Sequence, residues 1–226
     1  MDGSSLAILI PAYNEGGTIG TIVAQASAYG TVIVVDDCSL DDTRAKAAEA
    51  GAIVFRNDPN RGYDGTLSRA FEEAAARGFQ FVVTIDADGE HNPRLLAEFH
   101  RLLVDERVPL VLGIRPKKQR FSEVAMGLYI KSRFGVEDIL CGMKGYDMRL
   151  WRENGCFDHT NSIGTELAVN SIRRGAPFRQ TPVYGIQRAD TPRFGRPLSA
   201  NWRIFKALWR VIHRDLPPVT DRSGPL

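Results

Sequence analysis

The chain has 226 residues, a hydrophobic share of 43%, a charged share of 25% and a formal net charge of +2. This length and composition are typical of a globular domain with a substantial core and argue against a disordered chain. The small net charge gives no reason to expect a nucleic-acid partner. Cys38, Cys141 and Cys156 lack CxxC spacing, which predicts neither a disulfide framework nor a zinc site and favours a cytoplasmic location.

No segment of the sequence predicts a membrane span. Residues 1–5 are short and polar, and no run approaches the roughly 20 apolar residues that a spanning helix needs. Any membrane association is therefore expected to be peripheral, on the cytoplasmic face.

Short apolar runs alternate with helical patterns through the first half of the chain. Strands are expected at residues 6–10, 31–35, 52–55 and 81–85. Helices are expected at about residues 18–28, from 41–43, at 67–77 and from about 93. The first strand is expected to stop at Pro11. Four such βα units predict an α/β fold, with a Rossmann-like, mostly parallel sheet flanked by helices.

Polar residues follow each of these predicted strands. They lie at residues 13–15, 36–37, 60–65 and 86–88. Because ligands bind beyond the carboxyl ends of parallel strands, we expect the four groups to line one crevice. Each group alone is also common in turns and helix caps.

The acidic residues of segment 86–91 predict a metal site. Asp86, Asp88 and Glu90 alternate, so an extended segment would put three carboxylates on one side, as a hard divalent cation requires. Such an ion would neutralise charge that builds on a departing diphosphate. The alternative is a solvated acidic loop that caps the helix near Pro93.

Four motifs together resemble those of family 2 glycosyltransferases. Residues 10–15, 34–43, 60–62 and 86–88 are similar, in order and spacing, to P-x-Y-N-E, DD-x-S-x-D-x-T, N-x-G and DxD. The resemblance covers residues 5–115 firmly and extends more loosely to about Arg196. It implies a GT-A fold, a nucleotide-diphosphate sugar donor, Mg²⁺ or Mn²⁺, and inversion at the anomeric carbon. Rossmann dinucleotide binding is disfavoured, because residues 11–15 stand where G-x-G-x-x-G would be.

The resemblance also implies roles for individual residues. The donor-binding set is Pro11, Tyr13, Glu15, Val35, Asp36, Asp37, Gly65, Asp86 and Ala87. The metal set is Asp86, Asp88 and Glu90. The catalytic candidates are Asp88, Arg115 and Glu166.

The second half is most similar to the polyprenyl-phosphate hexose synthases, relatives of dolichol-phosphate mannose synthase. Residues 112–115, 120–122 and 138–149 carry this similarity, whereas 141–143 and 194–199 depart from the family motifs. Enzymes with saccharide acceptors carry a Glu-Asp pair that supplies a general base, and here residues 164–166 read Gly-Thr-Glu. This departure favours a phosphate monoester, which is already ionised and needs arginines to orient it. The acceptor-binding set is Arg115, Arg120, Ser122, Asp138, Arg188, Arg193 and Arg196.

Three alternatives stay open on the sequence alone. They are a family 2 transferase with a saccharide acceptor, a nucleotidyltransferase and a non-catalytic sugar-nucleotide-binding module. A nucleotidyltransferase is expected to carry a Gly-rich loop with a lysine or arginine after the first strand, and this loop is absent.

We expect one domain over residues 1–226. It is divided into a nucleotide-sugar half at about 5–115, a smaller acceptor half at about 116–215 and a flexible tail at 216–226. An apolar stripe in the second half is expected either to lie on a membrane surface or to pack on the domain. It comprises Trp202, Phe205, Leu208, Trp209 and Ile212.

Overall fold

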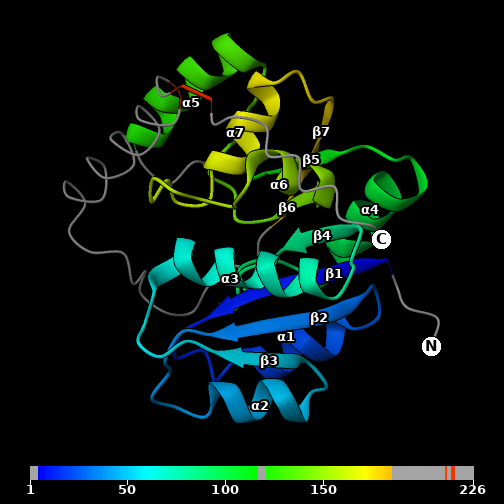
Figure 1. Ribbon diagram of the computed structural model, residues 1–226, viewed down its shortest axis with the longest axis vertical. Helices are drawn as coiled ribbons and strands as arrows, with labels where there is room; N and C mark the ends of the chain where they lie inside the picture. Colours follow the sequence, from blue (N-terminus) through cyan, green and yellow to red (C-terminus); the bar gives the residue numbers. More distant parts are fainter. Residues whose placement is uncertain (1–4, 117–120, 185–211, 213–214, 217–226) are drawn as a thin grey trace.

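The computed structural model describes residues 5–116, 121–184, 212 and 215–216, which form a sheet with helices on both faces (Figure 1). The strands are β1 (Leu6–Ala12), β2 (Thr31–Asp36), β3 (Ile53–Arg56), β4 (Phe81–Thr84), β5 (Leu110–Ile114), β6 (Lys144–Asp147) and β7 (Phe178–Pro182). Their order across the sheet is β3-β2-β1-β4-β6-β5-β7. Only β6 among them runs antiparallel to its neighbours, so the predicted α/β class with a mostly parallel sheet is confirmed.

Helices connect and cover these strands. They are α1 (Ile19–Ala26), α2 (Thr43–Glu49), α3 (Gly62–Ala76), α4 (Leu96–His100), α5 (Phe121–Phe134), α6 (Met148–Asn154) and α7 (Glu166–Arg173). A 3₁₀ turn at Pro93–Leu95 precedes α4, and a π-helical turn at Arg101–Asp105 follows it. Over the described residues, no helix combines the length and the apolar character needed to cross a membrane.

Strand β1, an interior strand of the sheet, lies between two hydrophobic clusters. Ala7 and Leu9 belong to the cluster that contains Phe71 of α3, whereas Ile8 and Ile10 belong to the cluster on the α1 face. This division follows from the period of two, because successive side chains of a strand point to opposite faces. Both faces of the sheet are therefore covered, which explains why β1 reads as a continuous apolar run.

The expectation that the first strand stops at Pro11 is wrong, because β1 continues to Ala12. Pro11 is paired in register with Val35 of β2, whereas β4 pairs with β1 only as far as Leu9. The last residues of β1 therefore have a strand neighbour on one side only. A proline, which lacks an N–H, is tolerated at such a position.

Helix α3 begins at Gly62, well before the predicted start at residue 67. The Asp37 carboxylate accepts the main-chain N–H groups of Arg61 and Gly62. The first N–H groups of a helix lack partners within the helix, so a carboxylate from another segment stabilises an early start. No local pattern in residues 60–66 could have shown this contact.

Ile212, the one described member of the apolar stripe, is 8% exposed and belongs to the same cluster as Phe71. This position packs on the domain rather than facing a membrane. Trp202, Phe205, Leu208 and Trp209 lie outside the described residues.

Gly113 in β5 lies where neighbouring segments pack too closely to admit a side chain. A Cβ added at Gly113 would lie 2.6 Å from Val183 Cγ2 and 2.8 Å from the carbonyl oxygen of Met143. We expect Gly113→Ala to lower the free energy of unfolding by about 1–3 kcal/mol, because the backbone must shift to admit the methyl group. Urea unfolding measures this change. Gly17→Ala is the control, since nothing lies within 4 Å of its Cβ, and an equal effect in both variants would contradict the packing argument.

Candidate active site

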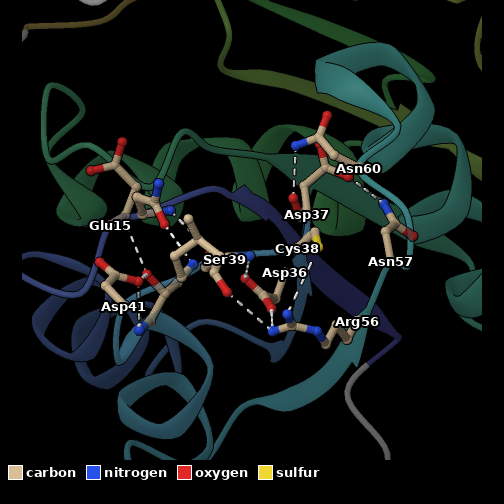
Figure 2. Close-up of polar contacts among 12 residues, drawn as sticks. Glu15, Asp36, Asp37, Cys38, Ser39, Asp41, Arg56, Asn57 and Asn60 are labelled. Carbon is tan, nitrogen blue, oxygen red and sulfur yellow. Dashed lines mark hydrogen bonds and ion pairs between the residues drawn. The ribbon is translucent and has the colours of Figure 1, made fainter.

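Main-chain groups join the loops that follow β1 and β2 (Figure 2). The N–H of Asn14 donates to Ser39 Oγ at 2.9 Å, and the N–H of Leu40 donates to Asn14 Oδ1 at 2.8 Å. The N–H of Glu15 donates to Thr43 Oγ1 at 2.7 Å. Two of the four predicted polar groups are thereby held together at the carboxyl edge of the sheet.

Asp36 is fully buried at the end of β2. Its carboxylate accepts the N–H of Ser39 at 3.1 Å and forms an ion pair with Arg56 at 2.9 Å (Figure 2). Burial of a carboxylate is tolerated because a cation and a main-chain donor satisfy both oxygens. Nucleotide binding by Asp36 stays a prediction, and the structure gives the residue a role in supporting the loop.

Asp37 connects the second polar group to the third. Its carboxylate accepts hydrogen bonds from Asn57 Nδ2 and from the N–H groups of Arg61 and Gly62, each at 2.8 Å. Its carbonyl oxygen accepts Asn60 Nδ2 at 2.7 Å (Figure 2). The N-x-G motif thus positions α3 against the end of β2, a structural role that the motif alone did not reveal.

The remaining donor candidates surround these loops. Tyr13 is 46% exposed, whereas Val35 and Ala87 are buried. Pro11 is half-buried near the end of β1. Gly65 lies in α3, where an added Cβ would stand 2.8 Å from Arg61 Cβ, so the helix has no room for a side chain there. Contact of these residues with a nucleotide stays a prediction.

Asp86 lies where three segments meet. Tyr63 in the first turn of α3 donates its hydroxyl to Asp86 Oδ1 at 3.2 Å, and His91 Nδ1 stands 3.6 Å from Asp86 Oδ2. A Cβ at Gly142, just before β6, would lie 2.1 Å from Asp86 Oδ2. The backbone therefore approaches this carboxylate as closely as a glycine allows. Sequence reasoning assigned no role to Tyr63 or Gly142.

The segment after Asp86 is a turn, so the expected alternation along an extended strand is wrong. Gly89 has a left-handed φ of 79°, and the N–H of Glu90 donates to Asp88 Oδ1 at 3.0 Å. Thr18 Oγ1 donates to the carbonyl oxygen of Ala87 at 2.6 Å, which ties the turn to the loop after β1. The acidic segment does not cap the next helical turn, where Asn92 Oδ1 accepts instead.

The side chains around this turn fit a hard divalent cation. Carboxylate oxygens suit Mg²⁺ or Mn²⁺, which proteins bind with one or two carboxylates completed by substrate phosphates. Asp86 and Asp88 supply such oxygens, and both lie in or next to the turn at the end of β4. Ligation by Asp86, Asp88 and Glu90 stays a prediction.

His91 is buried beneath the turn. Burial alone lowers its pKa, but the contact with Cys141, 4.0 Å away, and the negative charges of Asp86 and Asp88 outweigh burial and raise the pKa to about 9. The imidazolium therefore balances part of the carboxylate charge.

Among the predicted acceptor residues, Arg115 follows β5 and forms an ion pair with Asp138. Arg115 Nε and Nη2 donate to the two oxygens of Asp138 at 2.7 and 2.9 Å, and the N–H of Arg115 adds a bond of 3.2 Å. Burial raises the pKa of Asp138, but the Arg115 guanidinium outweighs it and holds the pKa below its usual value. Asp138 thus orients the guanidinium by a bidentate pair.

The other acceptor candidates cannot be placed. Ser122 falls within α5, where side chains of residues 121–126 are not described. Arg120, Arg188, Arg193 and Arg196 lie outside the described residues.

Glu166 begins α7 and its side chain is 4% exposed. It accepts the N–H of His159 at 2.9 Å and the Thr160 hydroxyl at 2.7 Å. Its carboxylate is therefore engaged with the loop before α7. A role in catalysis stays a prediction.

Two further charged residues hold this loop. Asp64 of α3 accepts the N–H groups of Gly164 at 2.6 Å and Ile163 at 3.2 Å. Lys144, buried in β6, donates Nζ to the carbonyl oxygen of Gly164 at 3.0 Å, and burial lowers its pKa. Sequence reasoning missed both residues, although a lysine inside the run 143–146 was a signal.

The fold and the site define an α/β protein whose polar loops meet an acidic turn at the carboxyl ends of parallel strands. Residues 7–163 match the family described as glycosyl transferase family 2. The undecaprenyl-phosphate mannosyltransferase of Micrococcus luteus is 31% identical over 206 residues, which cover 80% of this chain and 83% of that protein. The chain therefore belongs to glycosyl transferase family 2, and it is a glycosyltransferase.

Two further comparisons concern sequence and fold. A UDP-N-acetylglucosamine–dolichyl-phosphate N-acetylglucosaminyltransferase of Methanococcus voltae is 28% identical over 132 residues, covering 50% of this chain and 53% of that protein. Glucosyl-3-phosphoglycerate synthase of Mycobacterium tuberculosis, solved with Mn²⁺, UDP and phosphoglyceric acid, superposes with a TM-score of 0.73 at 20% identity, over 92% of this chain and 78% of that one. The predicted GT-A fold is confirmed.

The raised pKa of the Asp64 carboxyl group predicts that the stability of the fold depends on pH. Burial raises its pKa from 3.8 to about 6, the Asp158 carboxylate adds to this, and the N–H groups of Gly164 and Ile163 oppose it. Since the pKa is higher in the folded state, the stability that Asp64 contributes is complete below about pH 3.8 and is lost as the pH rises through about 6.

We therefore expect the free energy of unfolding of the wild type, relative to Asp64→Asn, to fall by about 1–2 kcal/mol between roughly pH 4 and pH 7. Denaturant unfolding at both pH values measures it. Asp105→Asn, on an exposed residue, is the control. A difference between wild type and Asp64→Asn that does not change with pH would contradict the raised pKa.

Proposed function

We propose that this chain is an inverting, metal-dependent transferase that moves a hexose from GDP-mannose or a UDP-sugar to a polyprenyl phosphate. The observation that carries the proposal is the placement of the Asp86 turn and the Arg115–Asp138 pair around one buried lysine. Lys144 of β6 pairs in register with Thr84, two residues before Asp86, and with Leu112, three residues before Arg115. A donor diphosphate and an acceptor phosphate would then meet near this lysine.

The donor side combines carboxylates with positioned loops. Mg²⁺ or Mn²⁺ held by Asp86 and Asp88, with Glu90 as the third candidate, would act as a Lewis acid for the leaving diphosphate. The loops after β1 to β3 would hold the nucleotide. Solved relatives of the same fold contain Mn²⁺ or Mg²⁺ together with UDP, which supports this choice of ion and donor.

The acceptor side supports a nucleophile that needs no general base. A phosphate monoester is largely ionised at neutral pH, so it can attack without losing a proton to a side chain. The Glu166 carboxylate accepts hydrogen bonds from His159 and Thr160, which favours a supporting role. Arg115, oriented by Asp138, would bind the acceptor phosphate.

The alternative acceptor is a saccharide in cell-surface glycan synthesis, with Glu166 as base. A lipid acceptor would instead place the protein peripherally at the cytoplasmic face of a membrane. The 31% identity to an undecaprenyl-phosphate mannosyltransferase supports the lipid acceptor.

The donor and its metal are tested by thermal unfolding with GDP-, UDP- and dTDP-sugars, each with and without Mn²⁺. A donor at about 100 times its Kd adds about 2.7 kcal/mol, or roughly 5–10 °C in Tm. We expect Asp88→Asn to lose the Mn²⁺-dependent part of this shift and at least about 100-fold in kcat, with its own Tm unchanged. Asp105→Asn should behave as the wild type. No shift with any donor, or full activity of Asp88→Asn, would refute the proposal.

The acceptor is tested by comparing transfer to undecaprenyl phosphate, dolichyl phosphate, the neutral polyprenol and a set of saccharides. We expect transfer only to the phosphates, and Arg115→Gln should lower kcat/KM for them by about 10-fold or more through loss of a charge-assisted contact. The donor-induced shift in Tm should be retained. Arg44→Gln, on an exposed residue of α2, is the control. Transfer to a saccharide alone would establish the alternative acceptor.

A further inference from the structure

Three metal-ligating side chains converge between α6 and α7, apart from the acidic turn. Within the described part of the chain, Cys156, His159 and Glu166 are the only set of three such residues whose ligand atoms all lie within 4.8 Å of one another. Cys156 Sγ is 2.6 Å from His159 Nδ1, and His159 Nδ1 is 3.3 Å from Glu166 Oε1.

We propose that these side chains, named here the Cys156 cluster, form a binding site for Zn²⁺ or a similar borderline divalent cation. A thiolate, an imidazole and a carboxylate are the ligands that such an ion takes in tetrahedral sites. The two anionic ligands balance its charge, and a fourth position is left for water or another ligand. Mg²⁺ and Mn²⁺, which prefer oxygen ligands, are disfavoured here.

The backbone around Phe157 holds Cys156 and His159 close together before an ion binds. Cys156 and His159 flank Phe157, whose side chain is 2% exposed and stacks on Phe71 at 4.7 Å. Gly155 ends α6 with a left-handed φ of 81° and so turns the chain toward Cys156. The ligands on either side of a buried anchor need little ordering before an ion binds.

The Glu166 carboxylate is held for ligation by its neighbours. Oε2 accepts the N–H of His159 and the hydroxyl of Thr160, which leaves Oε1 beside the imidazole. Hydrogen bonds of this kind fix the orientation of a metal-bound carboxylate.

Access and fit require one small movement. The His159 side chain is 53% exposed, and Cys156 is half-buried, so an ion can enter from solvent. With Zn–S of about 2.3 Å and Zn–N of about 2.0 Å, sulfur and nitrogen would stand roughly 3.5 Å apart on one ion. The exposed imidazole would move outward by about 1 Å.

An ion in the Cys156 cluster would also stiffen the loop that continues to α7. Gly164 of this loop is held by Asp64 and Lys144. The ion would join Cys156 and His159, at the beginning of this segment, to Glu166, at its end.

The test is titration of the metal-free full chain with Co²⁺, which reports ligation by a thiolate through a charge-transfer band in the near ultraviolet. We expect one equivalent to give this band and Zn²⁺ to displace it. Cys156→Ser should lose the band, and His159→Gln should weaken Co²⁺ binding by about 10-fold or more, because one of three protein ligands is gone. Excess Mg²⁺ should leave the band unchanged.

Two controls separate this site from others. Cys38→Ser removes another half-buried thiol and should keep the band. Asp88→Asn, in the acidic turn, should keep it too, whether or not the proposed transferase activity is found. Absence of the band in the wild type, or its survival in Cys156→Ser, would overturn the proposal.

Discussion

The carboxylate of Asp37 is the contact on which the arrangement of the site depends. It is almost completely buried, and three N–H donors from the Asn57 side chain and the Arg61 and Gly62 main chain satisfy it. A buried carboxylate without such donors would destabilise the fold by several kcal/mol. The end of β2 and the beginning of α3 are therefore fixed to one another, and the rest of the site is built on that helix.

Two neighbouring residues in the first turn of α3 connect the helix to two other parts of the site. Tyr63 donates to Asp86 in the acidic turn, and Asp64 accepts N–H groups from the loop before α7. The antiparallel strand β6 and the residues just before it meet both regions, with Gly142 beside Asp86 and Lys144 bonded to Gly164. The acidic turn and the loop before α7 are thus coupled through a single helix start and a single strand.

The sequence predicts the first four strands and the polar groups at their ends because both follow local patterns of period and composition. It does not predict β6, since a strand pairing depends on residues far apart in the chain. The prediction that Asp86, Asp88 and Glu90 lie on one side of an extended segment failed at Gly89. A single residue with a left-handed φ changes the direction of the side chains that follow it. The Arg115–Asp138 pair is likewise non-local: both residues were candidates, yet nothing in their spacing shows that they bind each other.

The same limit applies to the cysteines. Their number and the lack of CxxC spacing indicated no zinc site, yet folding brings Cys156 and His159 against a carboxylate at the start of α7. The two candidate metal sites differ in chemistry: carboxylate oxygens near Asp86 suit hard cations, and a thiolate with an imidazole suits borderline ones. Ligand type, rather than affinity alone, would therefore keep Mg²⁺ or Mn²⁺ at the donor and direct zinc to the loop.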